Sequence, residues 1–315
     1  MSTPISSRKA LHEWKLYLFI VPAIILVGVF CYFPAASAIY HSFFRWSGGT
    51  TKEFIGLQNF RDALGDRIFW YSFWVIAILV VSNVIKLVPS ILMAVLIHRL
   101  KSDRWQYLYR VGVVLPMIVP GLVTLFIWKF FFDPTQGALN GFLDATGLKA
   151  MLVWLDGMMG WDVFHEGIPI AWLGEPDLII PSLIIWGFPW IGAVGVLIYL
   201  AGLQSIGTEV YEAAELDGAS SWQKFRFVEF PLIMTQVRLS LVMLIIATLQ
   251  GFGLQFLLLG QDGGPGGRGM VPGLWMFNRA FLAGEFGYAC ALGIFLFVFI
   301  LGLTWINNRY VRVEK

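Results

Sequence analysis

Charged residues are scarce in this chain of 315 residues. Asp, Glu, Lys and Arg together make up 13% of it, whereas 58% of the residues are hydrophobic. An ordinary soluble domain carries about 25% charged residues. Six long stretches hold one charge or none, and each approaches the ~20 residues that cross a hydrocarbon core. The composition therefore excludes an ordinary soluble domain and favours a polytopic membrane protein.

Clustered metal ligands and phosphate-binding loops are also missing. The two cysteines, Cys31 and Cys290, lie in different apolar stretches, so they support neither a disulfide framework nor a metal site. The four histidines are scattered along the chain. No GxxxxGK[ST] pattern occurs, which excludes ATP binding by a Walker A loop. The sequence thus predicts no catalytic residue, no metal site and no cofactor bound by this chain.

The apolar stretches predict an all-α fold with six transmembrane helices. They fall at Leu16–Tyr40, Ile68–His98, Val111–Trp128, Leu178–Thr208, Leu239–Gln261 and Phe286–Asn308. The first resembles a signal peptide, because Ala36-Ser37-Ala38 fits a cleavage site. Its apolar part is longer than the ~7–15 residues of a signal core, so we expect a retained helix.

Lys and Arg are unevenly distributed between the predicted loops. They gather at both termini and in the segments 99–110 and 224–238. Since cytoplasmic loops are enriched in Lys and Arg, both termini are predicted to be cytoplasmic. The predicted parts are an arm at 1–15, a transmembrane domain at 16–308, a tail at 309–315, extracytoplasmic loops at 41–67, 133–177 and 260–285, and a cytoplasmic loop at 203–233.

The cytoplasmic loop at 203–233 contains two short helical patterns. Thr208 is the predicted N-cap of the first helix, which runs to about Asp217. Gly218 fits the C′ position, where a residue without Cβ adopts a left-handed conformation at little cost. Ser220 and Gln223 form a predicted capping box, so a second helix starts at once.

The first of these helices carries an unexpected cluster of acids. Glu209, Glu212, Glu215 and Asp217 fall within nine residues, and the spacing of three keeps the glutamates near one face. The cytoplasmic leaflet is anionic and repels such a face. A basic protein partner accounts for the cluster, and a solvated hairpin without a partner is the alternative.

The same residues form an ordered pattern that resembles the EAA loop of bacterial ABC importer permeases. The pattern consists of Glu212-Ala213-Ala214, Asp217-Gly218-Ala219, Phe225 and Phe230-Pro231-Leu232. Three further segments are similar to the sugar-permease branch of that family: Ala201–Ile206, Gly137–Asn140 and Gly263-Gly264-Pro265. One departure is Gly207, because that branch usually has proline there.

The resemblance implies an ABC importer permease fold with a cytoplasmic coupling helix that docks on a separate ATPase. The coupling residues that it implies are Glu212, Ala213, Ala214, Glu215, Asp217, Gly218 and Ala219. The implied partners are a second homologous permease subunit, two ATPase subunits that hold ATP and Mg, and an extracytoplasmic solute-binding protein. Nucleic acid is not among them. The implied location is the bacterial cytoplasmic (inner) membrane, with the chain embedded in lipid.

Polar and aromatic residues within the spans are candidates for a solute path. Lys86 lies near the middle of the second span, where a lysine costs ~2.5–3.5 kcal/mol on insertion scales. We therefore expect it to face the bundle interior or water, with structural pairing to a carbonyl or a partner's acid as the alternative. The candidate solute-path residues are Asn83, Lys86, Trp186, Trp190, Gln250 and Gln255.

The predicted function is inward movement of a sugar or sugar-like solute by ATP-driven alternating access. A permease for a non-sugar solute such as glycerol phosphate is the alternative within the same class. A membrane-embedded enzyme would show clustered His, Asp or Glu at the membrane face, and the acids at 209–217 have no histidine beside them. A secondary transporter would carry inverted repeats and intramembrane acids, whereas no Asp or Glu lies inside a predicted span.

Overall fold

The computed structural model describes residues 18–310. The predicted arm at 1–15 and residues 311–315 of the predicted tail lie outside the described residues. The chain divides into two units. The first contains the chain up to Asp66 together with Met276–Phe295, and the second contains Arg67–Trp275 together with the chain from Leu296.

The first unit begins with an apolar helix that has almost no packing within the chain. It consists of α3 (Val21–Val27), η1 (Gly28–Tyr32) and α4 (Phe33–His41). These form one stretch of 21 residues. In its most apolar part no residue is buried. A helix that is apolar on all sides is stable only against lipid or other helices.

A short antiparallel pair of strands follows this helix. β1 (Phe44–Trp46) pairs with β2 (Lys52–Phe54), and Arg45 lies opposite Glu53. The remaining elements of the first unit are α5 (Gln58–Gly65), η6 (Asn278–Leu282) and the beginning of α20 (Phe286–Tyr310). This pair is the one sheet among residues 18–310, and the prediction of an all-α fold is confirmed apart from it.

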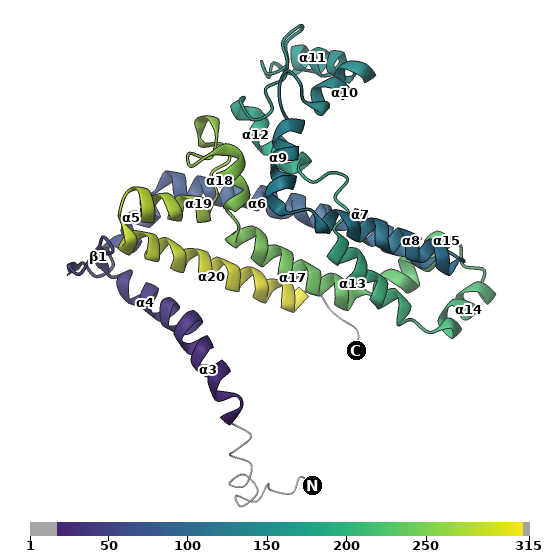
Figure 1. Ribbon diagram of the computed structural model, residues 1–315, viewed down its shortest axis with the longest axis horizontal. Coiled ribbons are helices and arrows are strands. Elements are labelled where there is room, and N and C mark those ends of the chain that lie inside the picture. Colours follow the sequence, from purple (N-terminus) through teal and green to yellow (C-terminus); the bar gives the residue numbers. More distant parts are fainter. Residues whose placement is uncertain (1–17, 311–315) are drawn as a thin grey trace, which may run out of the picture. The chain divides into compact units, whose positions relative to one another are not determined.

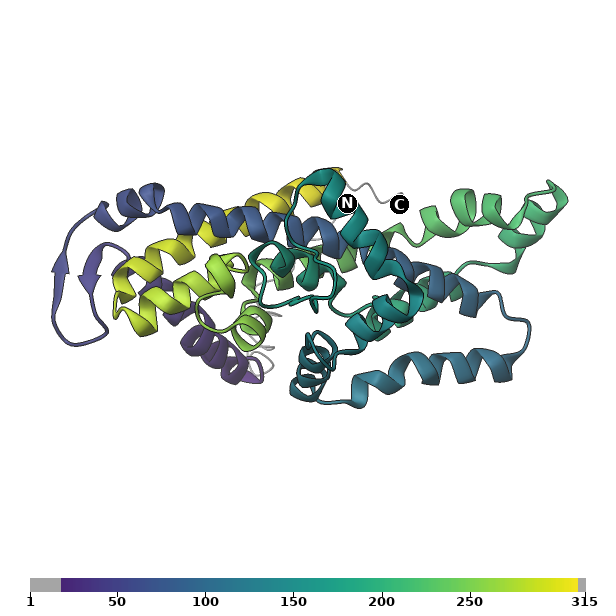
Figure 2. The same ribbon diagram turned by 90° about the horizontal axis from the view of Figure 1, so that it is seen from above.

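The second unit consists of helices joined by short breaks and, between Met159 and Pro176, by a longer loop (Figures 1 and 2). The first five are α6 (Arg67–Ile85), α7 (Leu87–His98), α8 (Asp103–Val114), η2 (Leu115–Ile118) and α9 (Gly121–Phe131). Next come α10 (Ala138–Thr146), α11 (Leu148–Met159), η3 (Pro176–Leu178), α12 (Ile179–Ile185) and α13 (Ala193–Gln204). The last are α14 (Thr208–Leu216), α15 (Ser221–Lys224), η4 (Phe225–Glu229), α16 (Phe230–Leu232), α17 (Met234–Gln250), α18 (Gly253–Leu259), η5 (Pro265–Gly267) and α19 (Pro272–Phe277).

Several predicted spans are broken rather than continuous. Among the described residues, three helices are long and apolar enough to cross a membrane unbroken, and up to six spans result if each bent pair counts as one. The third predicted span begins earlier than Val111, at Asp103, and bends by 89° before Gly121. Pro116 and Pro120 lie on the N-terminal side of Gly121, at the bend. Because proline lacks the N–H that continues a helix, the two prolines interrupt the span there.

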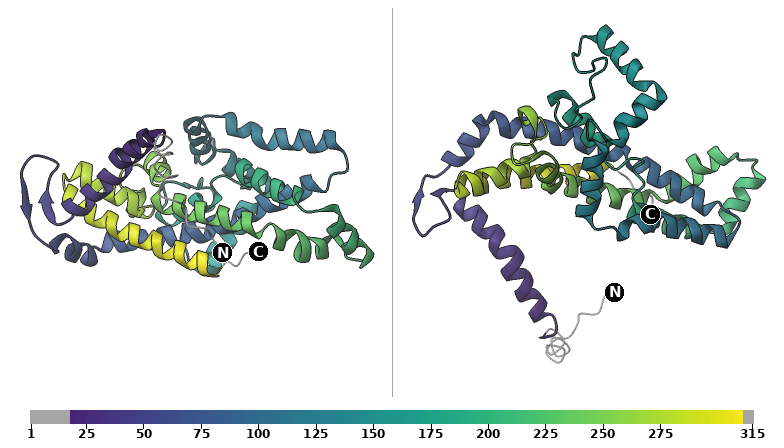
Figure 3. Two further views of the ribbon diagram at one scale, coloured as in Figure 1. Left: turned by 90° about the horizontal axis from the view of Figure 1, so that it is seen from below. Right: turned by 45° about the horizontal axis from the view of Figure 1, so that its top comes forward.

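The core of the second unit lies between α7 and α13. Ile91 and Ala94 of α7 pack with Val196 and Tyr199 of α13, and all four are buried. A Cβ built on Gly195 would lie 3.6 Å from Cβ of Ser90, an ordinary van der Waals distance, so α7 and α13 lie close together at this point. Figure 3 shows the two helices side by side. This packing holds α7 and α13 together, and both helices contribute residues to the cavity described below.

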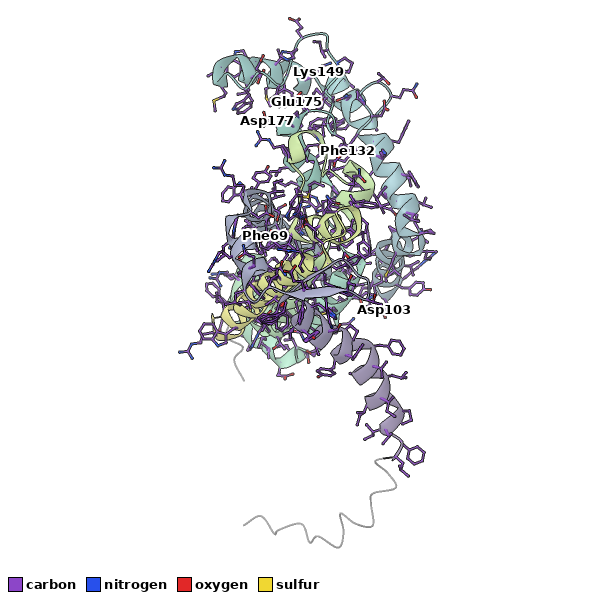
Figure 4. The ribbon with its side chains drawn as sticks, turned by 90° about the vertical axis from the view of Figure 1, so that its left-hand side faces the viewer. Phe69, Asp103, Phe132, Lys149, Glu175 and Asp177 are labelled. Atoms are coloured by element: carbon purple, nitrogen blue, oxygen red, sulfur yellow. The ribbon has the colours of Figure 1, made fainter. Side chains whose placement is uncertain are left out.

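The predicted extracytoplasmic loop at 133–177 is an ordered lobe with its own small core (Figure 4). Phe132 and Trp172 are buried in it. The Trp172 Nε1 donates to Asn140 at 2.9 Å, and the Asn140 amide donates to the carbonyl oxygens of Pro134 and Ile170. The segment at 150–168 begins in α11 of this lobe and continues beyond the end of that helix at Met159.

Candidate functional site

The predicted coupling helix is α14, which lies at one end of the second unit (Figure 2). The chain bends by 73° between α13 and α14. It returns through α15 and η4, then bends by 65° into α17. The two bends set α14 apart from the helices that enter and leave the hairpin, which we define as residues 203–233.

The turn at the end of α14 has the predicted left-handed glycine. Gly218 has φ +72°, and its N–H donates to the Glu215 carbonyl at 3.0 Å. The Ala219 N–H donates to the Ala214 carbonyl at 2.9 Å. These two bonds form a Schellman motif, which satisfies carbonyls that the end of a helix leaves free. The predicted position of Gly218 is confirmed.

The second helix begins with the predicted capping box. The Ser220 N–H donates to Oε1 of Gln223 at 2.7 Å, and the Gln223 N–H donates to Oγ of Ser220 at 3.3 Å. Both bonds are present, so this prediction is confirmed.

The predicted N-cap of α14 is wrong. Gly207 is the N-cap, with an extended conformation of φ −63° and ψ 147°, and Thr208 is the first helical residue. An N-cap must be extended while its carbonyl accepts the first helical bond, and the path from α13 places Gly207 there. Its φ is also the value that proline adopts. The backbone conformation at Gly207 is therefore one that proline, the usual residue of the sugar-permease branch at this position, would also adopt.

The acids of α14 differ in their surroundings. Glu215 forms an ion pair with Lys224 at 2.6 Å, and the Lys224 ammonium lowers the pKa of the Glu215 carboxyl. Glu209, Glu212 and Asp217 are exposed, and none of them forms an ion pair with another residue in the described part of the chain. Leu216 beside them is 91% exposed. We define the coupling surface as Glu209, Glu212, Leu216 and Asp217.

A buried ion pair joins the hairpin to α7. Arg99, the C-cap of α7, donates from Nε to Oε1 of Glu229 at 3.0 Å and from Nη2 to Oε2 at 2.7 Å. The Glu229 side chain is 1% exposed and that of Arg99 is 33% exposed. Arg99 also donates to the Ser221 carbonyl at 2.8 Å. One guanidinium thus holds both ends of the segment that returns from the turn.

A second contact joins α14 to the same end of α7. Oη of Tyr211 lies 3.1 Å from Nε2 of His98. Burial, together with a smaller effect of the nearby Glu229 carboxylate, raises the pKa of Tyr211 to about 12. The phenol therefore keeps its proton at neutral pH. His98 and Arg99 together attach both helices of the hairpin to the end of α7.

A cavity of about 440 Å³ lies in the second unit where three helix breaks meet. Lys86 lies at the break between α6 and α7, and Trp186 and Trp190 lie between α12 and α13. Gly251 and Phe252 lie between α17 and α18. Non-helical backbone inside a membrane is tolerated where it is buried in protein or lines a water-filled cavity.

The structure places five of the six candidate solute-path residues on this cavity. They are Asn83, Lys86, Trp186, Trp190 and Gln255. The Asn83 amide donates to Oγ1 of Thr248 at 3.1 Å, and Gln255 is 6% exposed. Gln250 is exposed and does not line the cavity. Whether any of the six contacts solute stays a prediction.

The Lys86 ammonium points towards the break after α12. Its Nζ lies 3.4 Å from the carbonyl oxygen of Leu183 and 3.5 Å from that of Trp186. It also lies 5.7 Å from the centre of the Trp190 ring. Lys86 therefore faces the bundle interior, as predicted, because it lines the cavity. It also lies near two carbonyl oxygens, as the alternative of structural pairing predicted.

Residues 87–312 match the family model described as the binding-protein-dependent transport system inner membrane component. The chain belongs to this family. The match contains both the hairpin and most of the cavity lining. The permease is accordingly a multi-pass membrane protein of an ABC transporter, as its resemblance to the EAA loop implies.

Similar proteins cover nearly the whole permease. A probable ABC transporter permease protein of Pyrococcus horikoshii is 30% identical over 95% of this chain and 96% of its own length. The trehalose/maltose transport system permease protein MalF of Thermococcus litoralis is 29% identical over 100% of both chains. A chain of a bacterial ABC transporter involved in the import of alginate, an acidic polysaccharide, has the same fold. Its TM-score is 0.76, with 21% identity over 97% of each chain.

Sequence reasoning missed the residues that anchor the hairpin of the permease. From the sequence, Arg99 is assigned only a role in topology, and Glu229, His98 and Tyr211 are assigned none. Glu229 lies between Val228 and Phe230 in an apolar entry to a span. A carboxylate in such a place needs a basic partner, and this signal was available from the sequence.

Proposed function

We propose that this permease moves a sugar into the cell, driven by ATP hydrolysis on two separate ATPase subunits that hold ATP and Mg. The name of the trehalose/maltose relative supports a carbohydrate solute. The proposed assembly also contains a second homologous permease subunit and an extracytoplasmic solute-binding protein. Both termini lie in the cytoplasm of a bacterium, and the spans cross its inner membrane.

The observation that carries this proposal is the attachment of the hairpin to α7. Glu212 and its neighbours face outward for an ATPase, while Arg99 and His98 fix the hairpin to the end of α7. At the other end of α7, the N-cap residue Lys86 lines the cavity. A helix is a stiff rod, and 12 residues span roughly 18 Å. Movement of the hairpin therefore reaches the cavity through one rigid element.

The proposal predicts that the permease purifies with an ATPase and a second permease subunit. A tagged chain would be isolated from its own membranes, its partners identified by mass spectrometry, and the complex reconstituted with the solute-binding protein. We expect uptake of a labelled oligosaccharide that stops without ATP and continues when ion gradients are dissipated. Uptake that follows a proton or sodium gradient instead would overturn the proposal in favour of a secondary transporter.

Replacement of Gly218 by valine should weaken association with the ATPase while leaving the amount of permease in the membrane unchanged. No atom lies within 4 Å of a Cβ built at Gly218, so the effect comes from the backbone alone. A β-branched residue with φ near +72° costs ~1–2 kcal/mol, and the turn would relax and misaim α14. The measurement is the amount of ATPase that co-purifies.

Gly218→Asn is the matched control for this substitution. Asparagine tolerates the left-handed conformation better than a β-branched residue, so this variant should retain most of the ATPase. If Gly218→Val co-purified with as much ATPase as the unmodified chain, the turn would not aim the coupling surface.

A further inference from the structure

One residue carries the charge of the cavity. Of the described residues that line it, Lys86 has the one formal charge, and neither Asp nor Glu is among them. The other lining groups are aliphatic side chains, amides, hydroxyls, glycines and aromatic rings. Removal of an ammonium from water is costly when no counter-ion accompanies it. The cavity therefore has an unbalanced positive charge.

The contacts of Lys86 leave donor capacity for another group. Its distances to the carbonyl oxygens of Leu183 and Trp186 are 3.4 and 3.5 Å, longer than the ~2.7–3.2 Å of good hydrogen bonds. The Trp186 carbonyl also accepts a hydrogen bond from Nε1 of Trp190 at 3.1 Å. An ammonium has three donors and no acceptor. Two long contacts to neutral oxygens orient it without neutralising it.

The neighbours of Lys86 suit the remainder of a sugar. Trp190 presents its ring 5.7 Å from the ammonium. Gln255 is buried, and its amide forms no hydrogen bond with another residue in the described range 18–310. An aromatic face for apolar ring surface and an amide for hydroxyls therefore lie on the same cavity as the charge. Its volume of about 440 Å³ falls within the ~300–1,000 Å³ of small-molecule pockets.

We propose that the cavity accepts an anionic sugar, whose carboxylate, sulfate or phosphate group pairs with the Lys86 ammonium. This inference rests on the proposed function and specifies its substrate class. The sugar ring lies against Trp190, and Gln255 donates to or accepts from its hydroxyls. A neutral sugar would fill the same space but would leave the charge of Lys86 unbalanced.

The competing role for Lys86 is structural. Its ammonium lies 3.4 and 3.5 Å from two carbonyl oxygens at the end of α12, and in this role it would hold the break between α6 and α7 against α12. That role makes a different prediction. Loss of the lysine would then impair transport of neutral and acidic solutes to the same degree, because the same helices surround either solute.

The test uses cells that contain the complete transporter, with the gene for this chain deleted and replaced by variants. Hydrolysates of plant and algal polysaccharides are separated by anion exchange into neutral, uronate and sulfated oligosaccharide fractions, and sugar phosphates form a fourth arm. Depletion of each fraction from the medium is measured by mass spectrometry and normalised to the amount of chain in the membrane. The variants are Lys86→Met, Lys86→Arg and, as a control lysine outside the cavity, Lys129→Met.

We expect the unmodified chain to deplete an anionic fraction. Lys86→Met should slow this depletion about tenfold or more, the effect of one hydrogen bond to a charged group, while Lys86→Arg and Lys129→Met retain it. Depletion of the neutral fraction alone would overturn the anionic class and leave sugar import intact. An equal loss of all fractions in Lys86→Met would assign Lys86 a structural role and also overturn the inference. Depletion of no fraction would overturn the proposed function itself.

Discussion

Glu229→Gln should uncouple ATP hydrolysis from transport and lower the thermal stability of the permease. The Glu229 side chain is almost fully buried against Arg99, so the substitution leaves a guanidinium without its counter-ion. Breaking a buried pair costs about 3–5 kcal/mol, and the lower end applies here because Arg99 is a third exposed. The segment that returns from the turn would also lose its ionic attachment to α7 and keep only the bond from Arg99 to the Ser221 carbonyl. The measurements are the melting temperature of the purified complex and the ratio of ATP hydrolysed to solute transported.

Glu53→Gln is a matched control, since it removes the same charge from an exposed pair. Arg45 and Glu53 lie 2.7 Å apart, but their side chains are 70% and 65% exposed. Exposed pairs contribute about 0–1 kcal/mol, so this variant should melt and transport almost as the unmodified chain does. The double variant Arg99→Met with Glu229→Met should recover stability, because well-packed apolar residues replace buried pairs at little cost. A Glu229→Gln permease with unchanged stability and coupling would show that the pair does not hold the hairpin.

Glu212→Lys should abolish transport through loss of the ATPase. Glu212 is exposed on α14, with no ion pair to another residue of the described chain, and its carboxylate is available to a basic group of a partner. A lysine there would place like charges together, and such juxtaposition at an interface weakens binding by well over an order of magnitude, ~tenfold per 1.4 kcal/mol. The six spans should still insert, because no contact inside the bundle changes. Co-purification of the ATPase and solute-stimulated ATP hydrolysis measure the effect.

Two further variants separate docking from general charge effects. Glu212→Gln removes the carboxylate without introducing repulsion, so its loss of ATPase should be smaller than that of Glu212→Lys. Glu166→Lys makes the same charge reversal on the exposed lobe at 133–177 and should leave ATPase association unchanged. Full uptake by the Glu212→Lys permease would show that this carboxylate takes no part in docking.

The hairpin shows which features of the site follow from neighbouring residues. The capping box of Ser220 and Gln223 and the left-handed turn at Gly218 were both predicted, and each depends on contacts within six residues. The N-cap was predicted wrongly, at Thr208 instead of Gly207, because both residues suit that position locally. The chain leaves α13 in a direction that requires the extended conformation at Gly207, so the helix begins at Thr208. The capping preference of a residue therefore decides where a helix begins only if the path of the preceding segment allows either residue to be the N-cap.

The ion pair of Arg99 with Glu229 depended on information that the sequence holds only in part. A lone acid among apolar residues at the start of a span demands a basic partner, but several Lys and Arg residues lie on the same predicted side. Arg99 and Glu229 are 130 positions apart in the chain. Their contact exists because α7 packs against α13, and this packing brings the end of α7 beside the hairpin.

Composition and spacing by themselves determined that the chain crosses a membrane, that it is helical and that an acidic hairpin separates two of its spans, because hydropathy and helix caps act over short distances. A proline or glycine lies at or near each of the three breaks around the cavity, namely Pro89, Pro189 and Gly251. Only the tertiary structure decided that the breaks at Lys86, Trp186–Gly192 and Gly251 meet on one cavity. It also separated Gln255, which lines that cavity, from Gln250, which is exposed. Non-helical backbone at Gly251 and Phe252 lies between the two amides, so helical spacing alone does not fix their relative directions.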